Sequence, residues 1–180
     1  MKHFSQIFAL WIVITAIQFA AQTSFAADKL NTAYISTTPG TSTVIQLAKD
    51  MRIFDKHGID ATVIFISGSV RGIQSILAGE IPIGEGGGPG LASARLAGGD
   101  VVAIAGNVNV LPYYLVSHPS IKRHEDLKGK IGGTHIAGTT AEFALKVGLK
   151  RIGLDPLKDV SLRVIGGAIE RMVALQKGIV

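Results

Sequence analysis

Short apolar runs alternate with amphipathic helical segments along most of the chain after residue 26. Apolar runs bounded by glycine, proline or polar residues predict strands at 30–35, 61–67, 81–84 and 101–108. Apolar residues at helical spacing predict helices at 44–54, 73–77 and 91–97, and Gly58 and Gly79 are placed to end the first two. Helices that alternate with strands in this way favour an α/β fold with a parallel sheet.

The same alternation restarts in the second part of the chain. A further extended run at 111–117 and a polar stretch at 118–126 precede strands at 130–135 and 160–165 and helices at 140–152 and 169–176. We therefore expect two lobes, at 27–115 and 116–180, and the second contains eleven basic and six acidic side chains. Two strands and two helices are too few to cover a sheet, so we expect the second lobe to be incomplete.

Residues 1–26 have the features of an export signal rather than of the fold. Lys2 precedes an apolar core at 7–17, and Ser24 and Ala26 occupy the small-residue positions before a cleavage site. The apolar core is shorter than the roughly 20 residues that a membrane-spanning helix needs. We expect cleavage after Ala26 and export of the remaining chain.

Composition removes several classes of function. The 180-residue chain contains no cysteine, which excludes disulfide scaffolds, thiolate zinc sites and cysteine nucleophiles. The five histidines lack the spacing of a metal site, and no GxSxG motif marks a serine nucleophile. Basic residues are spread among acidic ones without interleaved aromatics, so we expect no nucleic-acid partner despite the net charge of +5. We expect no cofactor, no metal and no catalytic residues.

Loops rich in glycine and hydroxyl residues follow the predicted strands. The glycine-rich loop at 84–90 lacks the lysine of a P-loop and the GxGxxG pattern of a dinucleotide site, and it predicts backbone N–H groups that a ligand can reach. In a parallel sheet these loops share one edge, where ligands bind in open α/β folds. The candidate ligand-binding residues in these loops are Ser36, Thr37, Thr38, Gly40, Ser67, Gly68, Gly86, Gly87, Gly138, Thr139 and Thr140.

The chemistry of this edge suits a small oxyanion such as a sulfonate, carboxylate or nitrate. Arg71 and Arg171 each follow one of these loops and are candidate anion anchors, while Glu85 could meet an amine and Tyr113 could stack on a ligand. A structural alternative stays open for every one of these residues. Serine, threonine and glycine are ordinary helix caps, charged residues are often solvated, and one residue of the Tyr113–Tyr114 pair could belong to the core.

Six segments follow one another in a specific order and spacing: 38–40 (TPG), 53–60 (IFDKHGID), 72–80 (GIQSILAGE), 126–132 (DLKGKIG), 153–160 (GLDPLKDV) and 174–178 (ALQKG). Together they resemble the periplasmic substrate-binding proteins of ABC importers, of the nitrate/sulfonate/taurine type. The resemblance spans about 28–180 and implies a type II periplasmic-binding-protein, or Venus-flytrap, fold. Family members are roughly twice this length, so the first lobe would be largely present and the second truncated.

The resemblance implies an extracytoplasmic solute-binding component of an ABC importer, which binds a small anion such as a sulfonate, taurine or nitrate between two lobes. Its partners would be the solute and the importer's permease and ATPase subunits, and we expect a monomer that is not an enzyme. Two alternatives stay open. One is an enzyme of pyrimidine or thiamine-precursor metabolism on the same fold, although such relatives use a cysteine-rich segment that is absent here. The other is a truncated gene fragment that binds nothing.

Overall fold

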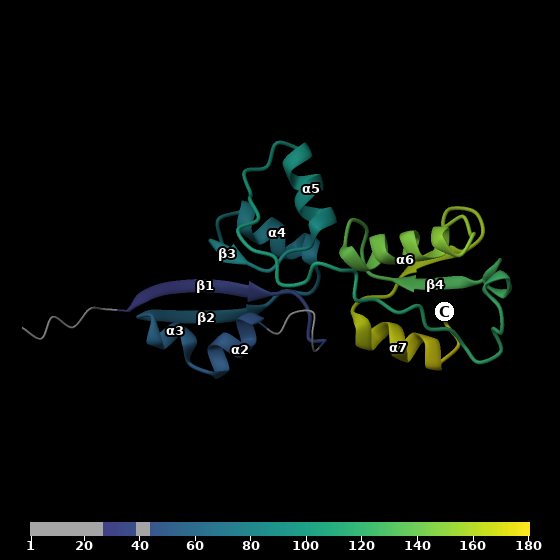
Figure 1. The fold of residues 1–180 in the computed structure, drawn as a ribbon, viewed down its shortest axis with the longest axis horizontal. Coiled ribbons are helices and arrows are strands. Elements are labelled where there is room, and N and C mark those ends of the chain that lie inside the picture. Colours follow the sequence, from purple (N-terminus) through teal and green to yellow (C-terminus); the bar gives the residue numbers. More distant parts are fainter. Residues whose placement is uncertain (1–26, 39–43) are drawn as a thin grey trace, which may run out of the picture.

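The computed structural model describes residues 27–38 and 44–180, which contain two parallel sheets (Figure 1). The expected signal peptide at 1–26 and the candidate residue Gly40 lie outside the described residues. The first sheet has the order β2-β1-β3, and the second pairs β4 with β5. The strands are β1 (Asp28–Tyr34), β2 (Ile59–Phe65), β3 (Ile83–Gly84), β4 (Ile131–Thr134) and β5 (Ser161–Val164).

Helices lie on both sides of each sheet and form the crossover connections that parallel strands need. In Figure 1, α2 and α3 lie on one side of β1 and β2, and α4 and α5 lie on the other. Around the second sheet, α6 and α7 lie on opposite sides of β4. The helices are α2 (Val44–Asp50), α3 (Ile53–Lys56), α4 (Ser69–Leu77), α5 (Gly88–Leu96), α6 (Thr140–Arg151) and α7 (Ala168–Gln176), and a short 3₁₀ helix (His124–Leu127) precedes β4.

Each sheet has a small group of buried apolar residues. In the first part, Ala33 and Ala61 on paired strands are buried, as is Ile73 of α4. In the second part, Leu149 of α6 packs with Leu154 and Val160, and partly buried apolar side chains surround them. The α/β architecture with parallel strands, expected from the alternation of patterns, is confirmed.

The helix predicted at 44–54 is instead two helices, α2 and α3, because the backbone changes direction at Arg52. Arg52 has left-handed dihedral angles (φ 55°, ψ 34°), which an α-helix cannot contain, and its Nε donates to Asp55 Oδ2 at 2.7 Å. Val44, Leu47 and Met51, which the helical spacing places on one face, remain more than half exposed. The predicted helix ends are confirmed: Gly58 and Gly79 have φ of 69° and 75°.

The strand predicted at 101–108 is wrong, and no strand forms in the extended run at 111–117 either. Within this segment the backbone bonds are local, since Val101 and Tyr113 donate to carbonyls two residues earlier. A strand requires a neighbour, and the preceding β3 contains only two residues, bounded by Pro82, which cannot donate to a ladder. The apolar pattern of 101–117 therefore belongs to a connection between the sheets, in which Val101 is buried and residues 102–117 are exposed.

Among the described residues, no helix is both long and apolar enough to cross a membrane. The boundary between the two expected lobes, placed between residues 115 and 116, stays a prediction.

Candidate functional site

The carboxyl ends of the strands in the two sheets face each other, so the loops that follow them meet (Figure 1). Ser67, after β2, lies 3.4 Å from His135, after β4, measured between Oγ and Nε2. The backbone N–H of Thr140 donates to Ser69 Oγ at 3.4 Å. A Cβ on Gly68 would come within 2.6 Å of His135 Cε1, and the φ of Gly68 is 90°, so only glycine suits this position.

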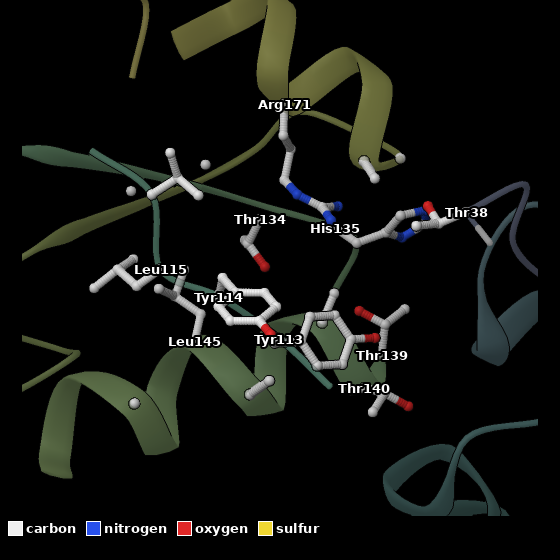
Figure 2. Close-up of a pocket in the computed structure, with 18 of the residues that line it drawn as sticks. Thr38, Tyr113, Tyr114, Leu115, Thr134, His135, Thr139, Thr140, Leu145 and Arg171 are labelled. Atoms are coloured by element: carbon white, nitrogen blue, oxygen red, sulfur yellow. The ribbon is translucent and has the colours of Figure 1, made fainter. Parts of the chain in front are cut away.

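A cavity of about 1520 Å³ lies between the two groups of loops. Most of the candidate residues that the sequence singled out line it, and they come from both sheets: Ser36, Thr37, Thr38, Ser67, Gly68, Gly86, Gly87, Tyr113, Thr139, Thr140 and Arg171. Glu85, Gly138 and Arg71 do not line it. Figure 2 shows Arg171 on one side of the cavity, Tyr113 and Thr139 on the opposite side, and Thr38 beside His135. The edge rule for parallel sheets therefore brings most of the candidates together.

The start of α6, one of the predicted anion sites, already satisfies much of its own hydrogen bonding. Thr139 Oγ1 donates to the Ile136 carbonyl at 2.8 Å and accepts from the N–H of Glu142 at 3.4 Å, so it caps the helix. The Glu142 carboxylate accepts from the N–H of Gly138 at 2.8 Å. A hydrogen bond with Lys146 is the main reason that the pKa of Glu142 is lowered, so this carboxylate places negative charge beside the loop.

Gly87, in the glycine-rich loop, lies against the first residues of two helices, Ser69 of α4 and Thr140 of α6. A Cβ built on it would overlap Thr140 Oγ1 and would lie 2.9 Å from Ser69 Cβ. The absence of a side chain at Gly87 thus allows the loop before α5 to approach the starts of α4 and α6. Gly88 next to it has open space around the same position.

Glu85 and Arg71 lie away from the cavity, at positions that differ in exposure. Glu85 is partly buried, and burial raises the pKa of its carboxyl, opposed by a backbone hydrogen bond from Ile35. Arg71 is an exposed residue of α4. Their use as direct ligand contacts has no support from the geometry of the cavity.

Two polar residues at the end of β4, Thr134 and His135, line the cavity but are not among the residues that the sequence predicts for the site. Both are buried, with 4% and 7% of their surfaces exposed. Burial is the main cause that lowers the pKa of His135, and the charges of Arg171 and Arg71 add to it, while Glu170 opposes it. The rule that selects the loop at 138–140 applies to this strand end too, so the signal is present in the sequence.

The Ser67–His135 pair does not have the hydrogen bonding of an activated nucleophile. His135 Nδ1 accepts from the N–H of Ile136 at 2.8 Å, so the neutral ring has its proton on Nε2. That nitrogen then donates toward Ser67 Oγ, whereas a general base would accept the proton of the serine. The pair joins the two groups of loops and does not prepare a serine for attack.

Arg171 extends from α7 toward Thr134 and His135 (Figure 2). Its Nη1 donates to the Gly166 carbonyl at 2.6 Å, and burial lowers its pKa, opposed by the nearby Tyr113 and Glu170. Tyr113 keeps 41% of its surface exposed; burial of the rest raises its pKa, while the positive charge of Arg171 opposes the rise. The cavity thus has a cationic group beside two hydroxyls, those of Thr134 and Tyr113. No group of three or more His, Cys, Asp or Glu side chains suited to a metal occurs in the described part of the chain.

Comparisons with known proteins bear on this arrangement. The family model described as NMT1/THI5 like matches residues 41–175. No curated protein matches the sequence. Among solved structures, the alkanesulfonate-binding protein SsuA from Xanthomonas axonopodis pv. citri, bound to MOPS, is similar with a TM-score of 0.63 and 19% identity. The match covers 84% of this chain and 52% of that chain.

Two further structures give the same result. The periplasmic aliphatic sulphonate binding protein SsuA from Escherichia coli has a TM-score of 0.57 at 20% identity, covering 85% of this chain and 49% of that one. A protein from Bordetella bronchiseptica RB50 has a TM-score of 0.61 at 21% identity. The match covers 84% of this chain and 49% of that protein's chain. This chain therefore spans about half the length of the structures it matches. The expected resemblance and the expected periplasmic-binding-protein fold are confirmed.

Proposed function

Because the chain belongs to the NMT1/THI5-like family, we propose that it is an extracytoplasmic solute-binding protein of an ABC importer, which binds a small organic or inorganic anion. The observation that carries this proposal is the cavity between the facing carboxyl edges of two parallel sheets, with hydroxyl, amide and guanidinium groups in its walls. Ligands bind at this edge in open α/β folds. In this role the site would bind and release its solute without chemical change.

The similar structures support the proposal through their fold and through the names of the proteins. The Xanthomonas protein is named as an alkanesulfonate-binding protein, and the Escherichia coli protein as periplasmic. We propose by analogy that this chain acts in the periplasm, that its solute is a sulfonate, taurine, nitrate or a similar anion, and that a permease and an ATPase are its partners. The candidate contacts are the lining residues of the facing loops, with Arg171 as the anchor for the anion.

The experiment is a thermal-shift and calorimetric screen of the full chain against butanesulfonate, taurine, nitrate and butylammonium. We expect at least one anion to bind saturably, and butylammonium to have no effect. A ligand at about 100 times its dissociation constant stabilises a protein by about 2.7 kcal/mol, which corresponds to a rise in melting temperature of about 5–10 °C.

The two alternatives have different outcomes in the same screen. If no anion binds the folded chain, the proposal is wrong and the non-binding fragment is favoured. If a bound compound is consumed and a product accumulates in a steady-state assay, the protein is an enzyme on this fold. Saturable binding with no product supports a binding protein.

A further inference from the structure

The edge of β4 that faces away from β5 has no strand paired with it in the part of the chain that the structure describes. The carbonyls of Lys130 and Thr134 accept hydrogen bonds from β5 and the residue after it. Because backbone groups alternate in direction along a strand, Ile131 and Gly133 direct their N–H and C=O groups to the opposite edge. Val180 lies against one face of Gly133 without a backbone hydrogen bond to it. Since partly buried backbone groups normally find partners, this edge is suited to receive a further strand.

The segment 110–117 faces the same space from another direction. It belongs to the connection that runs past β4 in Figure 1, and it lines the same cavity as β4. Tyr113 donates to the Leu111 carbonyl, whereas residues 114–117 form no backbone hydrogen bond with another described residue. Two rows of backbone groups without strand partners therefore border one cavity.

The cavity is larger than a solute site requires, and it extends along the whole of β4. Its volume of about 1520 Å³ exceeds the roughly 300–1,000 Å³ of small-molecule pockets. Solutes bind at the carboxyl ends of parallel strands, but this cavity reaches Ile131 at the amino end of β4, and Leu145 and Leu149 of α6. We name this part, bounded by β4, α6 and 110–117, the strand slot.

The strand slot lacks the features that protect other strand edges from pairing. Neither β4 nor the segment 110–117 contains a charged residue. By contrast, the edge strands β2 and β5 contain Asp60 and Arg163, and β3 has only two residues and follows Pro82. Charges, prolines and short lengths are the usual means by which strand edges avoid a partner. The slot is therefore suited to an extended, uncharged segment of polypeptide.

Residues 102–105 have the chemistry that the strand slot requires. The run contains neither charge nor proline, and its β-branched residues Val102 and Ile104, at alternate positions, are 68% and 74% exposed. None of the four residues forms a backbone hydrogen bond with another described residue. Alternating β-branched side chains favour a strand, which the run lacks a neighbour to form within its own chain.

We propose that residues 102–105 of a second copy of this chain enter the strand slot and pair with the free edge of β4. The pairing supplies hydrogen-bond partners to Ile131 and Gly133 and buries apolar side chains of the run against Leu145. When each copy both donates its run and accepts one, the contact closes into a symmetric dimer instead of the monomer that the resemblance implies. The inference does not depend on the proposed function, because the slot lies along β4 and not at the loops that follow the strands.

Disulfide cross-linking tests the pairing directly, because the chain contains no cysteine of its own. A size-tagged full chain with Ile131→Cys is mixed and oxidised with untagged chains that each contain one further cysteine: Val102→Cys, Ala103→Cys, Ile104→Cys or Ala105→Cys. Side chains on the same face of neighbouring strands lie within disulfide reach, whereas those on the opposite face do not. We therefore expect the yield of tagged–untagged disulfide on a non-reducing gel to alternate along the run.

Ser93→Cys, at an exposed position of α5, is the matched control for cross-linking. It reports collisions between copies and should give little disulfide with the tagged chain. The proposal is wrong if the run positions give no more disulfide than Ser93→Cys, or if all four give equal yields.

A second experiment blocks the strand slot without touching the run. Ile131→Pro removes an N–H that points away from β5, at the first residue of β4, where proline is tolerated. Ile131→Ala is the matched control, since it also shortens the side chain but keeps the N–H. By sedimentation, we expect Ile131→Pro to self-associate about 10-fold more weakly than Ile131→Ala, because one hydrogen bond to the second copy is lost and the pyrrolidine ring blocks the edge. Melting temperatures verify that both variants are folded.

Mixing two variants separates a strand in a slot from contact between two like surfaces. The Ile131→Pro chain keeps its run, and a chain with Val102→Lys and Ile104→Lys keeps its slot, so a mixture should form heterodimers more readily than either variant forms homodimers. If folded Ile131→Pro associates as strongly as Ile131→Ala, or if the mixture gains nothing over its components, copies do not pair through the slot. The anion screen described above has a separate readout, so the proposed function and this inference can fail independently.

Discussion

His135 joins the two halves of the site, because it follows β4 and contacts the loop after β2. The ring is buried, it receives the Ile136 N–H on Nδ1, and it lies against Gly68. Protonation would place a positive charge in a region already influenced by Arg171 and Arg71, with only Glu170 in opposition among the described residues. The hydrogen bond from the Ile136 N–H to Nδ1 therefore depends on a neutral imidazole, since a protonated Nδ1 cannot accept it.

We predict that the protein loses stability as the pH falls below about 6.5, the ordinary pKa of histidine. The folded-state pKa of His135 is lowered, so the unfolded chain binds a proton at a pH where the folded protein does not. The contribution is complete above the unfolded pKa and is lost progressively as the pH falls toward the folded one. Urea unfolding between about pH 5 and pH 8 measures it.

The matched variant for this prediction is His135→Gln, which keeps a polar side chain without an imidazole. Its free energy of unfolding should change less over the same pH interval than that of the unchanged chain. His118→Gln, at an exposed position, is the control and should keep the original slope. Equal slopes in all three proteins would show that His135 does not titrate in this way.

Residue types and strand ends allow much of the candidate site to be predicted. Ser36, Ser67 and Thr140 follow strands, and the edge rule places them around one cavity. Thr134 and His135 obey the same rule but are not singled out by it, because their burial and the missing partner of Thr134 are tertiary properties. Thr139 shows the opposite case, since a hydroxyl counted as a ligand contact also forms a helix cap.

At the scale of elements, the helix starts of α4, α5 and α6 converge near Gly87. The contact of this glycine with Ser69 and Thr140 ties the loop of the first sheet to the first turn of α6. A side chain at Gly87 would have to push the first residues of α4 and α6 away. The two halves of the site are therefore held by close backbone approach at this point.

We predict that Gly87→Ala destabilises the protein by about 1–3 kcal/mol, the usual cost of inserting atoms where there is no room. Gly88→Ala is the matched control: it adds the same methyl group one residue later, in open space at the first residue of α5. Alanine is a better helix former than glycine, but Pro89 disfavours a helical conformation for a preceding residue with a Cβ, so this variant should be close to neutral. Chemical denaturation compares the two, and equal stabilities would contradict the packing role of Gly87.

The periodicity of apolar residues predicts helices and strands well where local residues determine them. It predicts them less well where a second strand must be present to accept the hydrogen bonds. Glycine positions end the helices correctly at Gly58 and Gly79. The break at Arg52 has no sequence signal of that kind, since its residue type does not favour the left-handed region. The run at 101–108 has the composition of a strand, but a strand exists only where another strand accepts its hydrogen bonds.

At the scale of the whole molecule, the connection at 101–117 exposes large apolar side chains along its length, which we call the strip; of its residues Val102, Ile104, Val110 and Tyr114, the last two also line the cavity. Val102, Ile104, Val110 and Tyr114 are 68%, 74%, 73% and 92% exposed. Soluble monomers rarely expose contiguous apolar patches of more than a few hundred Å². Because the chain spans about half of the solved chains it matches, those proteins have further residues available to cover an equivalent strip.

We predict that the isolated chain self-associates through this strip, in contrast to the monomer expected from the resemblance. Exposed apolar side chains and unpaired backbone groups favour association with a second copy. The double variant Val102→Lys with Ile104→Lys should shift the population toward monomer, because each ammonium must stay hydrated. Sedimentation over a wide range of concentration measures the association.

The control for self-association places the same added charge on α5, away from the strip. Ala92 and Ser93 are both exposed residues of that helix, so Ala92→Lys with Ser93→Lys adds two ammonium groups without removing any residue of 101–117. General repulsion between copies would make both double variants more monomeric to the same extent. If copies contact each other through the strip, the Val102→Lys with Ile104→Lys variant should reduce self-association much more than the control variant does. A chain that stays monomeric throughout, or one that both double variants change equally, would show that the strip does not mediate contacts between copies.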